Sequence, residues 1–197
     1  MENMIMNDVN LREEAHKIAS ELFDQGKYED AFQKYIVLAN AGSITAQLII
    51  GWMYHSGLGV EKSLEEAQQW YQKAADANSS EGQFYLGTLY RSKQQYLQAV
   101  EWLTKSAAQK YMPASYRLGK MYDIGEGVNK DHIKAYEYFE QAAKMGHLFA
   151  QREIAVKMLK GHLGTINIIK GVFKFVRVLF AGARLASKDP DSDMIRK

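Results

Sequence analysis

One pattern of alanine, glycine and aromatic residues occurs twice in this chain, 68 residues apart, and it limits the folds that the chain can adopt. Self-similarity at a fixed spacing is typical of repeat architectures, in which one supersecondary unit is stacked several times. Each copy predicts a helix, a glycine-containing turn and a second helix. The pattern consists of Ala46, Gly51, Tyr54, Gly57, Gly59, Val60, Ala67, Trp70, Ala74 and Ala75, which correspond to Ala114, Gly119, Tyr122, Gly125, Gly127, Val128, Ala135, Tyr138, Ala142 and Ala143.

Glycine inside the first helix of each unit needs a physical reason, because glycine there costs about 1 kcal/mol relative to alanine. A close approach of two backbones supplies that reason. We expect each glycine to meet an alanine of the opposite helix, so that the two helices pack tightly. The expected pairs are Gly51 with Ala67, Gly87 with Ala99, and Gly119 with Ala135.

Turn and capping residues define the ends of these helices. Gly57 suits backbone at positive φ just past a helix end. Ser63 with Glu66 predicts a capping box, Asp131 predicts an N-cap, and Pro113 fits a first helical turn. The resulting helices are expected near residues 10–24, 28–41, 44–55, 63–77, 80–92, 95–110, 113–123, 131–145 and 147–160.

The order A-x4-G-x2-Y-x2-G-x-G-V, followed by an alanine, an aromatic pair and a double alanine, resembles the Sel-one-like repeat, a relative of the tetratricopeptide repeat. Residues 46–78 and 114–146 match this order almost completely, whereas 82–110 and 14–42 have a shorter connection that is nearer the tetratricopeptide form. The resemblance implies an all-α fold, an α-α superhelix (solenoid) of stacked antiparallel helix pairs. It also implies a role as an adaptor or scaffold for protein complexes, often at membranes.

The repeats predict a domain over residues 1–161, with units near 11–42, 46–78, 82–110 and 114–146 and a last unit from 147–161 onward. The last unit begins with Ala150 and Ile154 in the expected places. Asn167 and Lys170 then stand where an alanine and a tryptophan are expected. We therefore predict a separate apolar and basic C-terminal amphipathic helix over 162–186 and a disordered tail over 187–197.

Composition excludes several classes of function. The chain has 25 lysine and arginine residues against 23 aspartate and glutamate residues, and a net charge of +2 predicts no nucleic-acid partner. The absence of cysteine excludes disulfides, thiolate metal sites and cysteine nucleophiles. The N-terminus lacks a basic stretch followed by an apolar run, so we expect no secretory signal and a cytoplasmic location.

The first helix of each pair usually lines the inner surface of such a stack. Aromatic and arginine side chains on that surface suit protein binding, because they supply most hot-spot energy. The alternative, that the large rings pack between neighbouring repeats, stays open. The inner row comprises His16, Ser20 and Phe23; Leu48, Trp52 and His55; Phe84, Thr88 and Arg91; Tyr116, Lys120 and Asp123; and Arg152, Val156 and Leu159. The residues predicted to bind a protein or peptide are Trp52, His55, Phe84, Thr88, Arg91, Tyr116, Lys120 and Arg152.

The C-terminal stretch carries a second signal, because large apolar residues are almost continuous from Ile166 to Phe180. On a helix, its basic residues fall on one stripe. The free energy of inserting this stretch across a membrane is close to zero at best, since a central lysine or arginine costs about 2.5–3.5 kcal/mol and a large apolar residue returns about 0.3–0.6 kcal/mol. Lying on an anionic membrane surface fits better. The residues predicted to contact a membrane or partner are Lys170, Phe173, Lys174, Arg177, Phe180 and Arg184.

Two other roles for this stretch stay open: a cap on the last repeat, and docking on a partner or on a second copy of the chain. Catalysis has little support, because the five histidines are scattered and no paired-ligand, nucleophile-elbow or phosphate-loop motif occurs. We therefore expect no cofactor, no metal and no enzymatic activity. The sequence predicts an adaptor or scaffold that binds a protein segment on its inner face, with a peripheral membrane protein that binds anionic lipid as the alternative.

Overall fold

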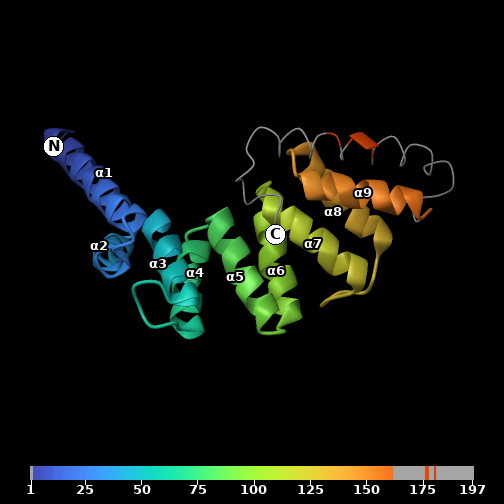
Figure 1. Ribbon diagram of the computed structural model, residues 1–197, viewed down its shortest axis with the longest axis horizontal. Helices are drawn as coiled ribbons and strands as arrows, with labels where there is room; N and C mark the ends of the chain where they lie inside the picture. Colours follow the sequence, from blue (N-terminus) through green and yellow to red (C-terminus); the bar gives the residue numbers. More distant parts are fainter. Residues whose placement is uncertain (1, 162–175, 178–179, 181–197) are drawn as a thin grey trace. The chain divides into compact units, whose positions relative to one another are not determined.

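All the regular structure in the described part of the chain is α-helical, as the sequence predicts (Figure 1). The computed structural model describes residues 2–161, 176–177 and 180, with side chains from Leu11 onward. Successive helices are joined by short turns. The helices are α1 (Glu2–Asp24), α2 (Tyr28–Asn40), α3 (Ile44–Ser56), α4 (Leu64–Asp76), α5 (Ser80–Ser92), α6 (Tyr96–Ala108), α7 (Met112–Ile124), α8 (His132–Lys144) and α9 (Leu148–Leu159).

These bounds agree closely with the predicted ones, except at the N-terminus. There α1 begins at Glu2 rather than near residue 10. No proline or glycine interrupts the first residues, so nothing in the sequence stops the helix from extending. The other helices follow the expected alternation of helix and turn.

The chain divides into two compact units: unit 1, residues 1–94, and unit 2, residues 95–197. In unit 1, each of the helices α1 to α5 packs on the next one along the chain. In unit 2, the helices α6 to α9 do the same. This nearest-neighbour packing is what a helical-repeat solenoid requires, because each unit buries its apolar face against the adjacent helices.

Each unit has its own apolar core. In unit 1, Ile50 and Met53 of α3 are fully buried and cluster with Phe32 and Trp70. In unit 2, the core forms around Phe139 of α8, which is also fully buried. The alanines at the starts of α3 and α7, Ala46 and Ala114, are fully buried, and their small side chains let the helices approach.

The atoms nearest to two of the helix glycines belong to rings and not to the predicted alanines. A Cβ atom added to Gly51 would lie 2.6 Å from the ring of Tyr71, and one added to Gly119 would lie 2.6 Å from the ring of Phe139. Both rings stand one helical turn after the expected alanine. The glycine therefore makes room for a large ring between the two helices, and close approach remains the reason for its presence.

The predicted helix caps form, with one difference. The Ser63 hydroxyl accepts a hydrogen bond from the Glu66 N–H at 3.2 Å, and the Asp131 carboxylate accepts bonds from two N–H groups of α8. In a complete capping box the Ser63 N–H would donate to the Glu66 side chain. Here it donates to the Tyr54 carbonyl oxygen at 2.9 Å. Pro113 lies in the first turn of α7, as expected.

The turn glycines join consecutive helix pairs. Gly59 and Gly127 have φ of +67° and +69°, in the left-handed region that favours glycine. Gly59 approaches the backbone of Tyr28 so closely that no side chain fits, and Gly127 lies in the same way against Tyr96. Each glycine turn therefore rests on the first residue of the second helix in the preceding pair.

None of the helices in the described part of the chain combines the length and the apolar character needed to cross a membrane.

Candidate protein-binding groove

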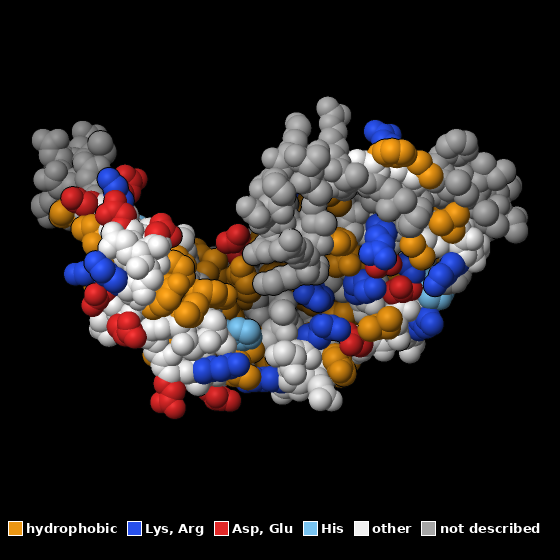
Figure 2. Space-filling view, viewed as in Figure 1, with side chains coloured by type: hydrophobic (Ala, Val, Ile, Leu, Met, Phe, Trp, Pro, Cys, Tyr) orange, Lys and Arg blue, Asp and Glu red, His pale blue; other side chains and the backbone are white. Residues whose placement is uncertain are grey.

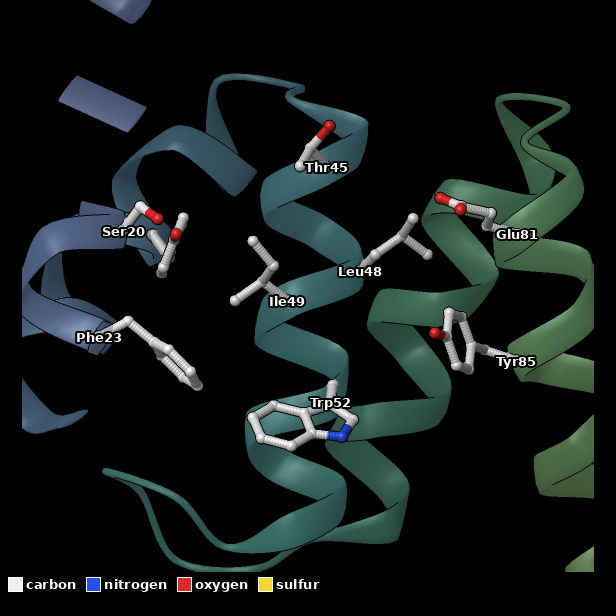
Figure 3. A pocket seen from close by; sticks show the side chains of 9 residues that line it. Ser20, Phe23, Thr45, Leu48, Ile49, Trp52, Glu81 and Tyr85 are labelled. Atoms are coloured by element: carbon white, nitrogen blue, oxygen red, sulfur yellow. The ribbon is translucent and has the colours of Figure 1, made fainter. Parts of the chain in front are cut away.

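A groove of about 490 Å³ opens on unit 1, between side chains of the first helices α1, α3 and α5 (Figure 3). Its volume falls within the range of about 300–1,000 Å³ that is typical of ligand pockets. The groove is an open trough with a mainly apolar lining. The lining residues are Ser20, Phe23, Tyr35, Thr45, Leu48, Ile49, Trp52, Glu81 and Tyr85.

Helix α3 forms the floor of the groove. Thr45, Leu48, Ile49 and Trp52 follow the spacing of one helical face, and Figure 3 shows these side chains along the same side of the helix. The core residues of α3 lie on the opposite face, so this helix is apolar on both sides. An amphipathic helix would need only one apolar face, which leaves the second face of α3 available for binding.

Aromatic contacts hold the groove in shape. The Phe23 ring lies 5.8 Å from the Trp52 ring, measured between centroids, and Trp52 is still 39% exposed. On the other side, Tyr85 stacks on the ring of Tyr71 at 5.3 Å. Figure 2 shows apolar side chains gathered on the visible face of unit 1 beside acidic ones. Pre-positioned rings bind with little loss of side-chain entropy, which favours tight binding.

Carboxylates act on two tyrosines that line the groove. Burial raises the pKa of Tyr85, and the nearby carboxylate of Glu81 raises it further. Burial also raises the pKa of Tyr35, opposed by a hydrogen bond from Ser20 and reinforced by the carboxylate of Asp24. No lysine, arginine or histidine is among the lining residues. The groove therefore combines apolar walls with one carboxylate, that of Glu81.

The binding residues predicted from the sequence include only part of this lining. Trp52 lies in the groove, and His55 is exposed one turn further along α3. Phe84, Thr88 and Arg91 are half-buried on α5 outside the groove. In their place α5 contributes Glu81 and Tyr85. These two residues are spaced i, i+4, and this spacing in the sequence indicates that they lie on the same face of the helix.

In unit 2, the predicted binding residues differ in their surroundings. The Tyr116 ring stacks on His147 at 4.3 Å and lies 5.8 Å from Phe139, so it packs between helices. Lys120 pairs with Glu153 at 3.3 Å. Arg152 is exposed on α9. Tyr116 thus fits the alternative of packing between repeats, while Arg152 remains accessible.

A buried ionic cluster lies in unit 2, at a position of the predicted inner row. The Asp123 carboxylate accepts hydrogen bonds from the buried Lys157 ammonium and, at 2.8 Å, from His132 Nδ1. Burial of Asp123 favours its neutral form, but the bonds from Lys157 and His132 outweigh burial and hold the pKa of Asp123 below its ordinary value. This cluster links α7, α8 and α9, and its role is structural.

The predicted C-terminal contact residues fall largely outside the described residues, as does the tail 187–197. Lys170, Phe173, Lys174 and Arg184 belong to this group. Arg177 and Phe180 are described, and both side chains are exposed, with Phe180 73% accessible. Among the described residues, no group of three or more histidine, aspartate or glutamate side chains could hold a metal ion.

The stack of helix pairs and the groove define a helical-repeat protein with a surface suited to binding. The Sel1 repeat model matches residues 44–79, 80–111 and 113–147, which together make up more than half of the chain, so this protein belongs to the Sel1 repeat family. These three matches confirm the resemblance to the Sel1 repeat, and they overlap the units predicted over 46–78, 82–110 and 114–146. Sel1 repeat proteins are generally adaptors or scaffolds in protein–protein interactions.

Solved structures and curated relatives agree with this assignment. A Sel1 repeat protein from Oxalobacter formigenes is 29% identical, with a TM-score of 0.76 over 85% of this chain and 68% of that one. Chitin synthase regulatory factor 3 of Schizosaccharomyces pombe is 28% identical over 66% of this chain, and alginate biosynthesis protein AlgK of Azotobacter vinelandii is 28% identical over 72%. The match spans only 15% and 31% of the length of these two relatives.

Proposed function

We propose that this protein is a non-enzymatic adaptor whose groove on unit 1 binds a segment of another protein in the cytoplasm. The observation that carries the proposal is the second apolar face of α3, which leaves Leu48, Ile49 and Trp52 in an open groove after the core has formed. Apolar grooves of this kind take the anchor side chains of a peptide or helix. Trp52 and Tyr85 are the best anchors, since tryptophan and tyrosine dominate hot spots.

One predicted residue extends the proposed contact beyond the groove. His55 is exposed on α3, one turn beyond Trp52, where it can supply a polar contact at the rim. One relative is a chitin synthase regulatory factor by name, and regulation through binding is consistent with an adaptor. The partner of this chain need not be the same.

Site-specific photo-cross-linking tests the proposal. A photoreactive phenylalanine analogue replaces Thr45, which is exposed in the groove, and in a matched chain it replaces Gln69, which is exposed on the second helix α4. After irradiation in cells of the source organism, we expect a defined partner to be cross-linked from position 45 and not from position 69. Trp52→Ala in the chain labelled at position 45 should reduce that product about tenfold or more, as loss of a hot spot predicts.

The same partner captured equally from both positions, or no effect of Trp52→Ala, would contradict the groove as the binding site. Circular dichroism and thermal melting of Trp52→Ala serve as the folding control. Trp52 is partly exposed, so its loss should leave the core of unit 1 intact.

Anionic lipid is the second candidate ligand, bound through residues 162–186. The exposed side chains of Val176, Arg177 and Phe180 favour it, because apolar and basic groups in the same stretch suit a membrane interface. The full chain should then co-sediment with vesicles that contain phosphatidylglycerol and not with phosphatidylcholine vesicles. Replacement of Arg177 and Phe180 by glutamate and serine should abolish this binding.

A further inference from the structure

The two sides of the groove on unit 1 differ in chemistry (Figure 3). Phe23 of α1 and the residues Ile49 and Trp52 of α3 line it with rings and an aliphatic chain. Helix α5 contributes the Glu81 carboxylate and the Tyr85 ring, whose hydroxyl points toward α3 in Figure 3. An occupant therefore meets apolar groups on one side and a carboxylate on the other.

The Glu81 carboxylate is available to an occupant of the groove. Its side chain is exposed in the first turn of α5. Among the described residues, Glu81 takes part in no ion pair, and no lysine, arginine or histidine lines the groove. A carboxylate beside apolar walls favours a ligand that brings a cation and disfavours an acidic one.

Spacing along the helices fixes the distance between the carboxylate and the aromatic end of the groove. Glu81 and Tyr85 are four residues apart on α5, which is about one helical turn, or about 5.4 Å. Leu48 and Trp52 have the same spacing on α3. Figure 3 shows the two pairs in the same order along their helices. The carboxylate therefore lies about one turn from the rings of Trp52 and Tyr85.

We propose that the groove recognises a partner segment by a lysine or arginine that pairs with Glu81, beside a large apolar side chain that packs on Phe23 and Trp52. On a helical segment these two side chains are three or four residues apart. The aliphatic stem of the basic residue covers Leu48, and its charged end reaches Glu81. The inference rests on the proposed adaptor function and adds the chemistry of the partner.

Selection from a random peptide library displayed on phage tests this specificity. The full-length protein is immobilised, as are the variants Glu81→Lys and Trp52→Ala and the control Glu29→Lys. Glu29 is a matched control because it is the second residue of α2, as Glu81 is of α5, and it is exposed outside the groove lining. Circular dichroism and thermal melting show whether each variant is folded.

We expect the peptides selected on the natural protein and on Glu29→Lys to carry lysine or arginine three or four residues from a tryptophan, phenylalanine or leucine. A selected peptide should bind Glu81→Lys about fivefold more weakly, since like charges then face each other. Replacing the basic residue of the peptide by glutamate should restore binding to Glu81→Lys. This exchange of charges separates a direct contact from general damage to the groove.

Failure of the inference differs from failure of the adaptor function. Apolar peptides without a basic preference that are lost on Trp52→Ala would overturn the inference and leave the groove as a binding site. An affinity unaffected by Glu81→Lys would overturn it in the same way. Peptides that bind the natural protein and Trp52→Ala equally, or a library with no enriched peptide, would contradict the groove itself and the inference with it.

Discussion

At the scale of single residues, the glycines inside the helices are explained by the side chains that pack against them. Gly119 tolerates no Cβ because the Phe139 ring occupies the space. The glycine lowers helix propensity by about 1 kcal/mol relative to alanine, yet it permits a fully buried ring at the centre of unit 2. The packing gained therefore outweighs the propensity lost.

Gly119→Ala should destabilise the protein by about 1–3 kcal/mol, because overpacking of the Phe139 ring exceeds the gain in helix propensity. Urea unfolding at equilibrium measures the change. Gln69→Ala is the control, since it alters an exposed helix position and should shift the free energy of unfolding by less than about 0.5 kcal/mol. A stabilised Gly119→Ala variant would contradict the steric account.

His147 makes stability depend on pH. Its Nδ1 accepts a hydrogen bond from the Ala150 N–H at 3.2 Å and so caps α9, which requires that Nδ1 carry no proton. Burial lowers the pKa of His147 below its ordinary value. The folded state therefore binds a proton on His147 less readily than the unfolded state does. The contribution of His147 to stability is full above about pH 6.5 and is lost as the pH falls below that value.

We expect His147→Asn to reduce the loss of stability between pH 7.5 and pH 5.5, because asparagine caps a helix without titrating. Urea unfolding of both proteins at the two pH values measures the difference. Identical pH dependence in the two proteins would show that other groups cause the loss. The remaining histidines are present in both chains and cancel in the comparison.

At the scale of helices, two devices hold neighbouring elements together. The first is the ionic cluster of Asp123, Lys157 and His132, which joins α7, α8 and α9. Removing one charge from a buried pair leaves the other uncompensated, whereas an apolar replacement of both is often neutral.

Asp123→Ala should therefore cost about 3–5 kcal/mol, because Lys157 is 3% exposed and would lose its counter-ion. The double variant Asp123→Ala, Lys157→Met should recover most of that loss. Thermal melting and urea unfolding of the two variants test the pair. If the single and double variants were equally stable, the Lys157 ammonium would cost nothing without its counter-ion, which would show that water already solvates it.

The second device is the glycine turn that rests on the preceding helix pair. Gly127→Ala should destabilise unit 2 more than Gly146→Ala does. Both glycines have positive φ, so both variants incur the backbone penalty. A Cβ at position 127 would lie 2.6 Å from the Cβ of Tyr96, whereas one at position 146 meets nothing within 4 Å. The difference, expected at about 1–3 kcal/mol in urea unfolding, isolates the contact between turn and helix. Equal losses would assign the whole effect to backbone strain.

At the scale of the whole molecule, the five basic residues between 164 and 188 predict an effect of salt on lipid binding. Raising the ionic strength from about 0.01 M to about 0.15 M shortens the Debye length from about 30 Å to about 8 Å. Co-sedimentation of the full chain with vesicles that contain phosphatidylglycerol should then fall by about twofold or more. Binding that is independent of salt would assign it to apolar contacts alone.

The sequence by itself determined the helices, their turns and the family, because these depend on local rules. The Ser63 and Asp131 caps, the positive φ of Gly127 and the repeat spacing are set by residues close together in the chain. The sequence also identified Trp52 as a candidate for binding.

Only the tertiary structure decided which side chains meet across helices. The Tyr71 ring lies nearest to Gly51, because side chains on a helix lean toward its N-terminus and a large ring reaches the space one turn earlier. Tyr116, which the sequence predicts to bind a partner, stacks on His147. Tyr85 joins Trp52 in the groove because α1, α3 and α5 contribute to one trough, and that arrangement depends on packing between helices that no local pattern records.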